Sequence, residues 1–178
     1  MENPGSLTTS SSKKQHLTEF QDLETKEGEL YLRFYVTSER EFALPATVVR
    51  EVISAPLDRI TPIPNAAYSL LGTMNLRGRV IWVADLSYVL GEANPLNTER
   101  SEMPVIAIAE QDTMVGLAVD RIVGMEWLDT EQVQTHQQAL SPGMTSFVRG
   151  EWLLDERTHK SLQLLDQTAI IQSELWAA

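Results

Sequence analysis

The amino-acid sequence predicts a mainly β protein built from two small β-barrels, with short helices and a C-terminal helix. The first observation is the number of short apolar runs rich in β-branched and aromatic residues, each bounded by turn-forming residues. The second is a weak internal repeat, because a strand–turn–strand pattern at 30–44 occurs again at 105–119. A charged and then apolar segment follows each copy. Many short strands arranged twice are typical of two barrels lying side by side.

The first copy of the pattern begins with Leu30–Val36, an aromatic and aliphatic run that predicts a strand. A polar turn separates it from a second strand at Glu41–Leu44. Pro45 then opens the segment Ala46–Ile53, where the apolar spacing fits one or two helical turns and the β-branched content fits a strand nearly as well. Prolines around Leu57–Ile63 favour an edge strand there.

A β-hairpin over residues 71–86 is the most informative local feature, and its turn is Arg77-Gly78. Gly78 has no Cβ and takes the positive φ that a tight hairpin turn requires. The run Val80–Val83 is expected to be buried on both faces, because it is a continuous series of strand formers. The turn presents the Arg77 guanidinium at the tip of a stiff element, which suits recognition of a partner's carboxylate or carbonyl groups. A simply solvated arginine is the equally simple alternative.

The segments that follow continue the β pattern, with a short helix at Leu86–Leu90 that Gly91 ends. A polar connection leads to the second copy of the repeat. Its expected strands are Val105–Ala109 and Met114–Val119, with Asp120–Leu128 continuing the second of them.

The end of the chain is expected to hold a second arginine–glycine turn, Arg149-Gly150, which echoes Arg77-Gly78. Short strands flank this turn at Thr145–Val148 and Glu151–Leu154, after a loop-like stretch at 129–143. A final strand covers Ser161–Leu165. Asp166 then caps a C-terminal helix that runs from Thr168 to Trp176.

These elements define the expected domain limits. Residues 1–28 form a flexible or partly helical tail in which Leu17, Phe20 and Leu23 are spaced by three, as on one face of a helix. The folded domain covers 29–173, with barrels at approximately 29–90 and 104–165 and the C-terminal helix packing back. Residues 174–178 form the C-terminal end.

Composition limits the function classes. The 178 residues carry a net charge of −11, which disfavours binding to nucleic acid or to anionic membranes. The absence of cysteine excludes disulfides and thiolate chemistry and fits a reducing compartment. The polar N-terminus resembles no signal peptide, and no apolar run approaches the roughly 20 residues of a membrane helix, so direct membrane insertion is not expected. The sequence therefore indicates a cytoplasmic location.

Catalytic and metal-binding signals are absent from the sequence. The three histidines (His16, His136 and His159) are far apart, and no phosphate-binding loop, dinucleotide fingerprint or nucleophile elbow occurs. Trp82, Trp127 and Trp152 are expected in the core. We therefore expect no enzyme, no catalytic residue, no metal and no cofactor. The alternative is a small-ligand-binding or enzymatic β-barrel protein that uses scattered carboxylates, which are Glu51, Asp85, Asp120 and Asp155; for Asp85 and Asp155 a cap or turn role is the simpler reading.

An ordered set of motifs resembles the CheW-type coupling proteins of bacterial chemotaxis-like signalling. The motifs are Asn75-Leu76-Arg77-Gly78, the run Val80–Leu86 that ends in Asp85-Leu86, the upstream Val48–Val52, and the downstream Gly116–Gly124. The resemblance covers about residues 29–173 and leaves the tail uncovered. The match is loose over Asp129–Gly143 and Asp155–Lys160.

This resemblance implies two SH3-like five-stranded β-barrels packed over a shared apolar core, and a non-enzymatic adaptor. Such proteins bridge the cytoplasmic tip of a chemoreceptor to the regulatory domain of a CheA-type histidine kinase, within receptor arrays of bacteria. The receptor's helical hairpin docks in a groove between the barrels, lined by residues matching Val49, Glu51 and Arg77, with Gly78 supporting the turn. The kinase surface lies on the first barrel. The receptor can belong to chemotaxis, phototaxis or pilus-based motility.

Overall fold

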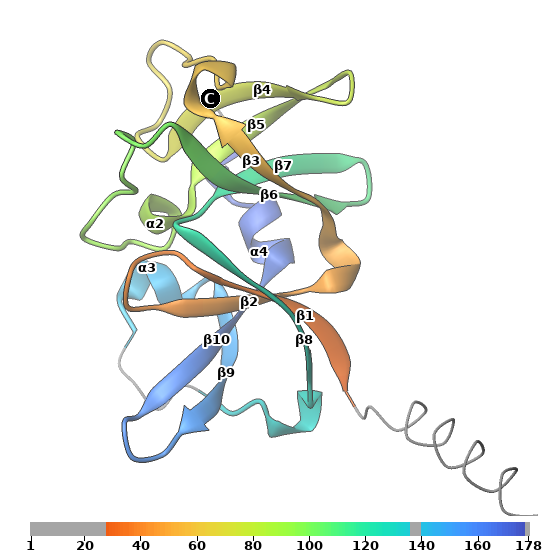
Figure 1. The fold of residues 1–178 in the computed structure, drawn as a ribbon, viewed down its shortest axis with the longest axis vertical. Coiled ribbons are helices and arrows are strands. Elements are labelled where there is room, and N and C mark those ends of the chain that lie inside the picture. Colours follow the sequence, from red (N-terminus) through yellow and green to blue (C-terminus); the bar gives the residue numbers. More distant parts are fainter. Residues whose placement is uncertain (1–27, 136–139, 177–178) are drawn as a thin grey trace, which may run out of the picture.

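The computed structural model describes residues 28–135 and 140–176, so almost all of the expected tail, together with His16 and His136, lies outside the described residues. Within these described residues, ten strands form two five-stranded sheets, each curled around its own apolar interior (Figure 1). The expectation of a mainly β fold with two barrel subdomains is confirmed. The strands are β1 (Glu29–Tyr35), β2 (Glu41–Pro45), β3 (Val49–Pro56), β4 (Leu70–Leu76), β5 (Arg79–Asp85), β6 (Glu102–Glu110), β7 (Thr113–Ala118), β8 (Arg121–Leu128), β9 (Val148–Asp155) and β10 (Lys160–Leu165).

Short helices connect and close the strands. They are the 3-10 turns η1 (Ala46–Val48), η2 (Leu57–Arg59), η3 (Thr130–Gln132) and η4 (Glu174–Trp176), and the α-helices α2 (Leu86–Val89), α3 (Pro142–Thr145) and α4 (Gln167–Ile171). Asp85 and Asp166 cap α2 and α4, because their carboxylates accept hydrogen bonds from the backbone N–H groups of Ser87 and Ala169. The expected C-terminal helix therefore begins at its predicted cap, and it is broken into α4 and η4.

The two barrels do not divide the chain into successive halves. Strands β3 to β7, which cover residues 49–118, form one sheet in the order β3-β6-β7-β5-β4; we call it the central barrel. Strands β1 and β2 from the start of the fold and β8, β9 and β10 from its end form the other sheet, in the order β8-β1-β2-β10-β9; we call it the terminal barrel. The expected limits of 29–90 and 104–165 are therefore wrong. The reason is that β1 and β2 pair with β8 and β10 from the far end of the chain.

The sequence repeat is nevertheless visible in the topology. Adding or subtracting five from each strand number turns the order β8-β1-β2-β10-β9 into β3-β6-β7-β5-β4. The parallel pair β2–β10 of the terminal barrel corresponds to the parallel pair β5–β7 of the central barrel. The two halves of the chain are thus equivalent, and each contributes strands to both barrels.

The repeat also explains why the predicted Arg149-Gly150 turn is wrong. These residues lie inside β9, and Gly150 corresponds to Gly72 of β4, next to an isolated bridge in both barrels. A Cβ on Gly150 would lie 2.7 Å from the Gln134 carbonyl oxygen, so close backbone approach and not a turn requires glycine there. The true counterpart of the Arg77-Gly78 turn is the β9–β10 turn, where His159 has a φ of 53°. Residues 142–145, partly expected as a strand, are helical.

Two further expectations need correction, and one open alternative is resolved. The segment Leu57–Ile63 is no edge strand, since it forms η2 and a single bridge from Thr61 to Thr73. Pro62, directly after the bridge, has no N–H group with which to continue a ladder. The expected strand Met114–Val119 ends at Ala118 and does not continue into Asp120–Leu128, because β8 is a separate strand that belongs to the other barrel. Segment Ala46–Ile53 combines both alternatives, with one 3-10 turn before a strand.

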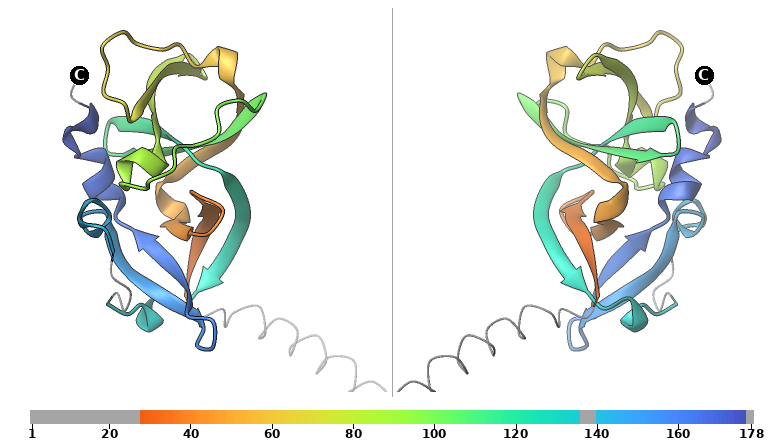
Figure 2. Two further views of the ribbon diagram at one scale, coloured as in Figure 1. Left: turned by 90° about the vertical axis from the view of Figure 1, so that its left-hand side faces the viewer. Right: turned by 90° about the vertical axis from the view of Figure 1, so that its right-hand side faces the viewer.

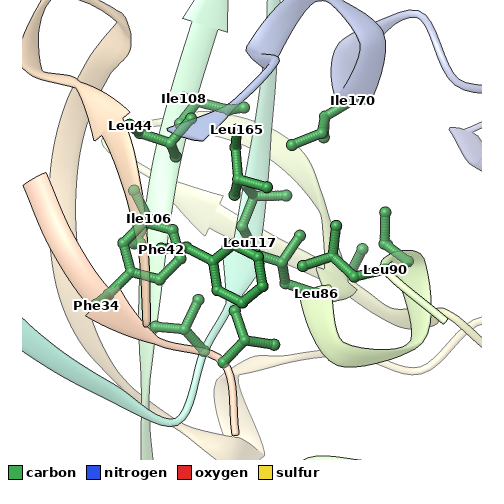
Figure 3. Packing of buried hydrophobic residues seen from close by; sticks show 14 of the residues in the cluster. Phe34, Phe42, Leu44, Leu86, Leu90, Ile106, Ile108, Leu117, Leu165 and Ile170 are labelled. Atoms are coloured by element: carbon green, nitrogen blue, oxygen red, sulfur yellow. The ribbon is translucent and has the colours of Figure 1, made fainter. Parts of the chain in front are cut away.

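A shared apolar core lies between the barrels. Figure 3 shows Phe34 and Phe42 of the terminal barrel packed beside Ile106 and Leu117 of the central barrel, with Ile170 of α4 at one side. The side views in Figure 2 show α4 crossing from the end of β10 to the central barrel. The shared core that the family resemblance implied is therefore present, and it joins the two barrels into one unit.

Burial around this core differs from two expectations. Ile81 and Val83 fill the central barrel and Trp82 packs against the shared core, so two-faced burial holds for this stretch. Val80 lies beyond the core and is 67% exposed, so the expectation is wrong there. Trp152 is buried as expected, whereas Trp127 is 48% exposed and belongs to no core.

The interior of the terminal barrel contains a charged network at one end. The Glu41 carboxylate is almost fully buried, and its Oε1 accepts a hydrogen bond of 2.7 Å from Nε of Arg33. Arg33 also pairs with Glu126 of β8. The Lys160 Nζ lies 4.0 Å from the second Glu41 oxygen. This network ties β1, β2, β8 and β10 together at one end of the barrel.

Glu41→Ala is expected to lower the free energy of unfolding by about 3 kcal/mol, because it leaves the partly buried Arg33 cation without its main partner. Chemical denaturation measures this loss. The control is Asp120→Ala, which removes a more exposed pair with Arg100 and should cost less than about 1 kcal/mol. Equal losses for the two variants would contradict a structural role for the buried pair.

A candidate protein-contact site at the β4–β5 turn

The β4–β5 turn holds two successive residues in left-handed backbone conformations. Arg77 has a φ of 49° and Gly78 a φ of 84°, the combination that a two-residue hairpin turn requires. The Asn75 side chain closes the turn, since its Oδ1 accepts a hydrogen bond of 2.9 Å from the Gly78 N–H. The positive φ predicted for Gly78 is confirmed. Arg77 adopts a conformation that non-glycine residues rarely take, which stores strain at the residue expected to bind a partner.

Arg77 forms a two-pronged ion pair with Glu51. Its Nε donates to Glu51 Oε2 at 2.8 Å and its Nη2 donates to Oε1 at 3.1 Å. Glu51 lies on β3 and Arg77 follows β4, and these are the two edge strands of the central barrel. The pair therefore connects the two edges of the curled sheet. The Arg77 side chain is 78% exposed, so most of the guanidinium still faces solvent.

The ion pair shifts the pKa of both partners. Hydrogen bonds from Arg77 lower the pKa of the Glu51 carboxyl below its ordinary value of 4.5, and the same bonds raise the pKa of Arg77. Because the Glu51 pKa is lower in the folded protein than in the unfolded chain, the stabilisation by the ion pair is complete at pH values above the ordinary Glu51 pKa. This stabilisation is lost as the pH falls through the lowered pKa. The site is therefore charged as Glu51⁻ and Arg77⁺ throughout the neutral range.

A hollow of about 300 Å³ lies beside the pair. Its lining residues are Arg50, Glu51, Leu76, Arg77, Arg79 and Met114. Three arginines face one carboxylate around apolar side chains, although the protein as a whole carries a net charge of −11. This local excess of positive charge favours a partner with acidic and apolar groups.

The structure brings together two of the three predicted groove residues. Val49 lies two positions before Glu51 on β3, but a register shift separates them and Val49 packs against the shared core. Sequence reasoning missed four residues that line the hollow, which are Arg50, Leu76, Arg79 and Met114. Arg79 directly follows the turn glycine, so its place beside the turn could have been predicted from the sequence. Met114 could not, because it is brought to the site by pairing between strands that are distant in sequence.

The candidate carboxylates of the alternative function are held apart. Asp85 is buried and accepts hydrogen bonds from Ser87 and from the Leu96 N–H, so it has the structural role of a cap. Asp155 accepts from the Arg157 N–H in the β9–β10 turn, and Asp120 pairs with Arg100. Each of these groups, like Glu51, has its own local contacts, and they form no acid–base pair with one another. The enzymatic alternative thus loses the convergence that it needs.

Residues 28–135 and 140–176 contain no candidate metal site. No three histidine or acidic side chains within these ranges come together in a way that could hold a metal ion. None of the helices in the same ranges is long and apolar enough to cross a membrane.

Comparison with known proteins identifies the family. Residues 30–175 match the model of the CheW-like domain. The chain belongs to the CheW-like domain family. Among its relatives, the chemotaxis protein CheW of Rhizobium meliloti is 31% identical over 75% of this chain and 83% of that protein. Protein PilI of Pseudomonas aeruginosa is 30% identical over 62% of this chain, and the match covers only 60% of PilI.

The fold agrees with that of a solved CheW. The crystal structure of the scaffolding protein TtCheW from Thermoanaerobacter tengcongensis superimposes with a TM-score of 0.67 and 22% identity, over 85% of this chain and 94% of that one. The chain is a member of the CheW-like family with chemotaxis proteins among its relatives, and family membership supports a non-enzymatic role.

Replacing Arg77 with glutamine is expected to raise the Glu51 pKa back toward 4.5, because the charged hydrogen bonds that lower it are removed. The side-chain carboxyl resonance of Glu51, followed by NMR through an acid titration, measures the shift. Arg79→Gln is the matched control, since Arg79 lines the same hollow but donates to the Asp112 carbonyl. A Glu51 pKa that responds equally to both changes would contradict a specific pair.

Gly78→Ala is expected to destabilise the fold by about 1 kcal/mol, because alanine is strained at a φ of 84° although a Cβ would meet no other atom there. Gly143→Ala is the control. This glycine lies in α3, and a Cβ added to it would lie 3.9 Å from its nearest neighbours, so alanine there should stabilise by about 0.5 kcal/mol. Thermal or urea unfolding compares the two, and a stabilising Gly78→Ala would overturn the assignment of the turn.

Proposed function

We propose that the protein couples the cytoplasmic signalling tips of methyl-accepting chemoreceptors to a CheA-type histidine kinase. It works without catalysis, in the bacterial cytoplasm, as a component of receptor arrays that serve chemotaxis, phototaxis or pilus-based motility. Membership of the CheW-like family supports the adaptor role. The observation that carries the choice of site is the Glu51–Arg77 pair, held on a strained turn with most of the guanidinium exposed.

The site suits a helical partner. A receptor tip is a helical hairpin, and at this site its helix would place apolar side chains in the hollow and acidic side chains toward the arginines. Leu76 and Met114 supply apolar contact in the hollow, while Arg50, Arg77 and Arg79 supply positive charge. Apolar burial provides affinity, and the charges orient the partner and select it. Val49 extends this surface along β3 toward the shared core.

Glu51 has a different task from Arg77. It fixes the guanidinium in one orientation by two hydrogen bonds, so the arginine meets its partner with less loss of side-chain freedom. Gly78 and Asn75 fix the backbone that carries the arginine. The second partner, the regulatory domain of the kinase, binds elsewhere on the barrels, so both proteins can be held at the same time.

Arg77→Glu is expected to leave folding intact and to weaken binding of a receptor signalling-tip fragment at least tenfold, or about 1.4 kcal/mol, because it places a repelling charge in the contact. Pull-down and titration with the purified fragment from the same organism measure the loss. Arg157→Glu is the matched control, since it makes the same charge reversal on the equivalent turn of the terminal barrel and should bind normally.

The double variant Glu51→Arg/Arg77→Glu separates contact from support. It restores an ion pair between the two edge strands but exchanges the charge that faces the partner. Under the proposal binding stays weak. Restored binding in this variant would mean that the ion pair only supports the structure of the barrel and does not contact the receptor. Unchanged binding by a folded Arg77→Glu variant would contradict the assignment of the site.

A further inference from the structure

A β-bulge in β3 aims Arg50 into the hollow of the candidate site. Val49 pairs with Ile108 of β6, and Glu51 pairs with Ala107, the neighbouring residue of that strand, so Arg50 is an extra residue without a partner there. A bulge of this kind interrupts the regular alternation of side chains along a strand and gives the extra side chain a new direction. Arg50 and Glu51, although adjacent in sequence, accordingly line the same hollow.

The bulge belongs to the repeated frame of the two barrels. In the terminal barrel Ile122 pairs with Phe34 and Gly124 pairs with Arg33, so Val123 is the extra residue of β8. Strands β3 and β8 are equivalent edge strands, and each therefore has a bulge at the equivalent place. Because valine occupies this position in one barrel, the bulge itself does not require the arginine that occupies it in the other.

The three arginines of the hollow differ in their partners. Arg77 donates Nε and Nη2 to Glu51, and Nη2 of Arg79 donates to the Asp112 carbonyl. The Arg50 side chain is exposed and has no hydrogen bond or ion pair with any residue that the structure describes. Since Arg77 already balances the charge of Glu51, the positive charge of Arg50 is left uncompensated at the hollow.

The apolar lining of the hollow is held in place by the barrel. Leu76 and Met114 are partly buried and pack against the interior of the central barrel. A partner that enters the hollow therefore meets fixed apolar atoms together with the free cation of Arg50. Residues three or four positions apart share one face of a helix. The surface that fits is a helix with an acidic residue and an apolar residue at this spacing.

We infer that Arg50 binds one carboxylate side chain of the helical partner and thereby determines which partner is selected. This inference rests on the proposed function, because the partner is the receptor tip. Arg77, held by Glu51, orients the contact, while Arg50 supplies the charge that no group of the site balances. A guanidinium binds a carboxylate through two parallel N–H···O bonds, whereas a lysine ammonium offers only a point charge.

Titration of the full chain with the purified receptor signalling-tip fragment tests the role of Arg50. Arg50→Gln is expected to weaken binding about fivefold, and Arg50→Lys about twofold, because lysine keeps the charge but loses the paired bonds. Arg59→Gln is the matched control, since Arg59 lies in η2 of the same barrel and does not line the hollow. The control should bind like the wild type. Equal binding by a folded Arg50→Gln variant and the wild type would overturn the inference.

An exchange of charges identifies the acidic residue of the partner. Each acidic residue of the fragment is replaced by arginine in turn, and the variants are titrated with Arg50→Glu. We expect one replacement to restore binding to Arg50→Glu and not to Arg77→Glu. No restoring replacement, or one that restores both variants equally, would overturn a specific contact of Arg50. A fragment that does not bind the wild type would overturn the proposed function and this inference with it, whereas a fragment that binds the wild type and all Arg50 variants equally would overturn the inference alone.

Discussion

The fold depends on the parallel pairing of β2 with β10, which joins residues 41–43 to residues 162–164. The terminal barrel cannot close before the last strand is present, although its first hairpin is among the earliest segments of the chain. The central barrel lies between these strands in sequence, and the chain crosses from one barrel to the other at η1 and again before β8. After β10, α4 crosses back, places Ile170 in the shared core and bonds Thr168 to Glu110 of β6. A partner that docks near one barrel therefore acts on a single connected unit.

Closure of the central barrel also positions the candidate site. Its edge strands β3 and β4 approach each other because the sheet curls, and the Glu51–Arg77 pair spans their two edges. An exposed ion pair contributes little to stability, so support of the barrel does not explain an arginine held at a strained φ. Asparagine or glycine would satisfy the turn with less strain. A residue that violates local preference on a stiff, exposed turn is typical of a site selected for function.

Local patterns predicted the strands well because strand formers, turn residues and caps act over a few positions. The β1–β2 and β4–β5 hairpins, the Asp85 cap and the positive φ of Gly78 all follow from such short-range rules. The division of the strands between the two barrels could not be predicted from local patterns, because it is decided by pairing between segments that are distant in sequence. Gly150 shows the same limit. The dipeptide Arg149-Gly150 resembles a turn, but glycine is required there because the Gln134 backbone lies too close for a Cβ. No local sequence pattern reveals this contact. In the site, Met114 was missed for this reason.

The duplicated topology allows the two barrels to be compared position by position. The Arg77-Gly78 turn and the β9–β10 turn are equivalent, and each contains a residue with positive φ. Their neighbouring edge strands have diverged. β3 presents Glu51 beside three arginines, whereas β8 presents Val123, Met125 and Trp127. One copy of the unit therefore offers oriented charge and the other offers apolar surface. Charge favours selective contact with a partner, and exposed apolar surface favours association through burial, so one duplicated frame can serve two different contacts.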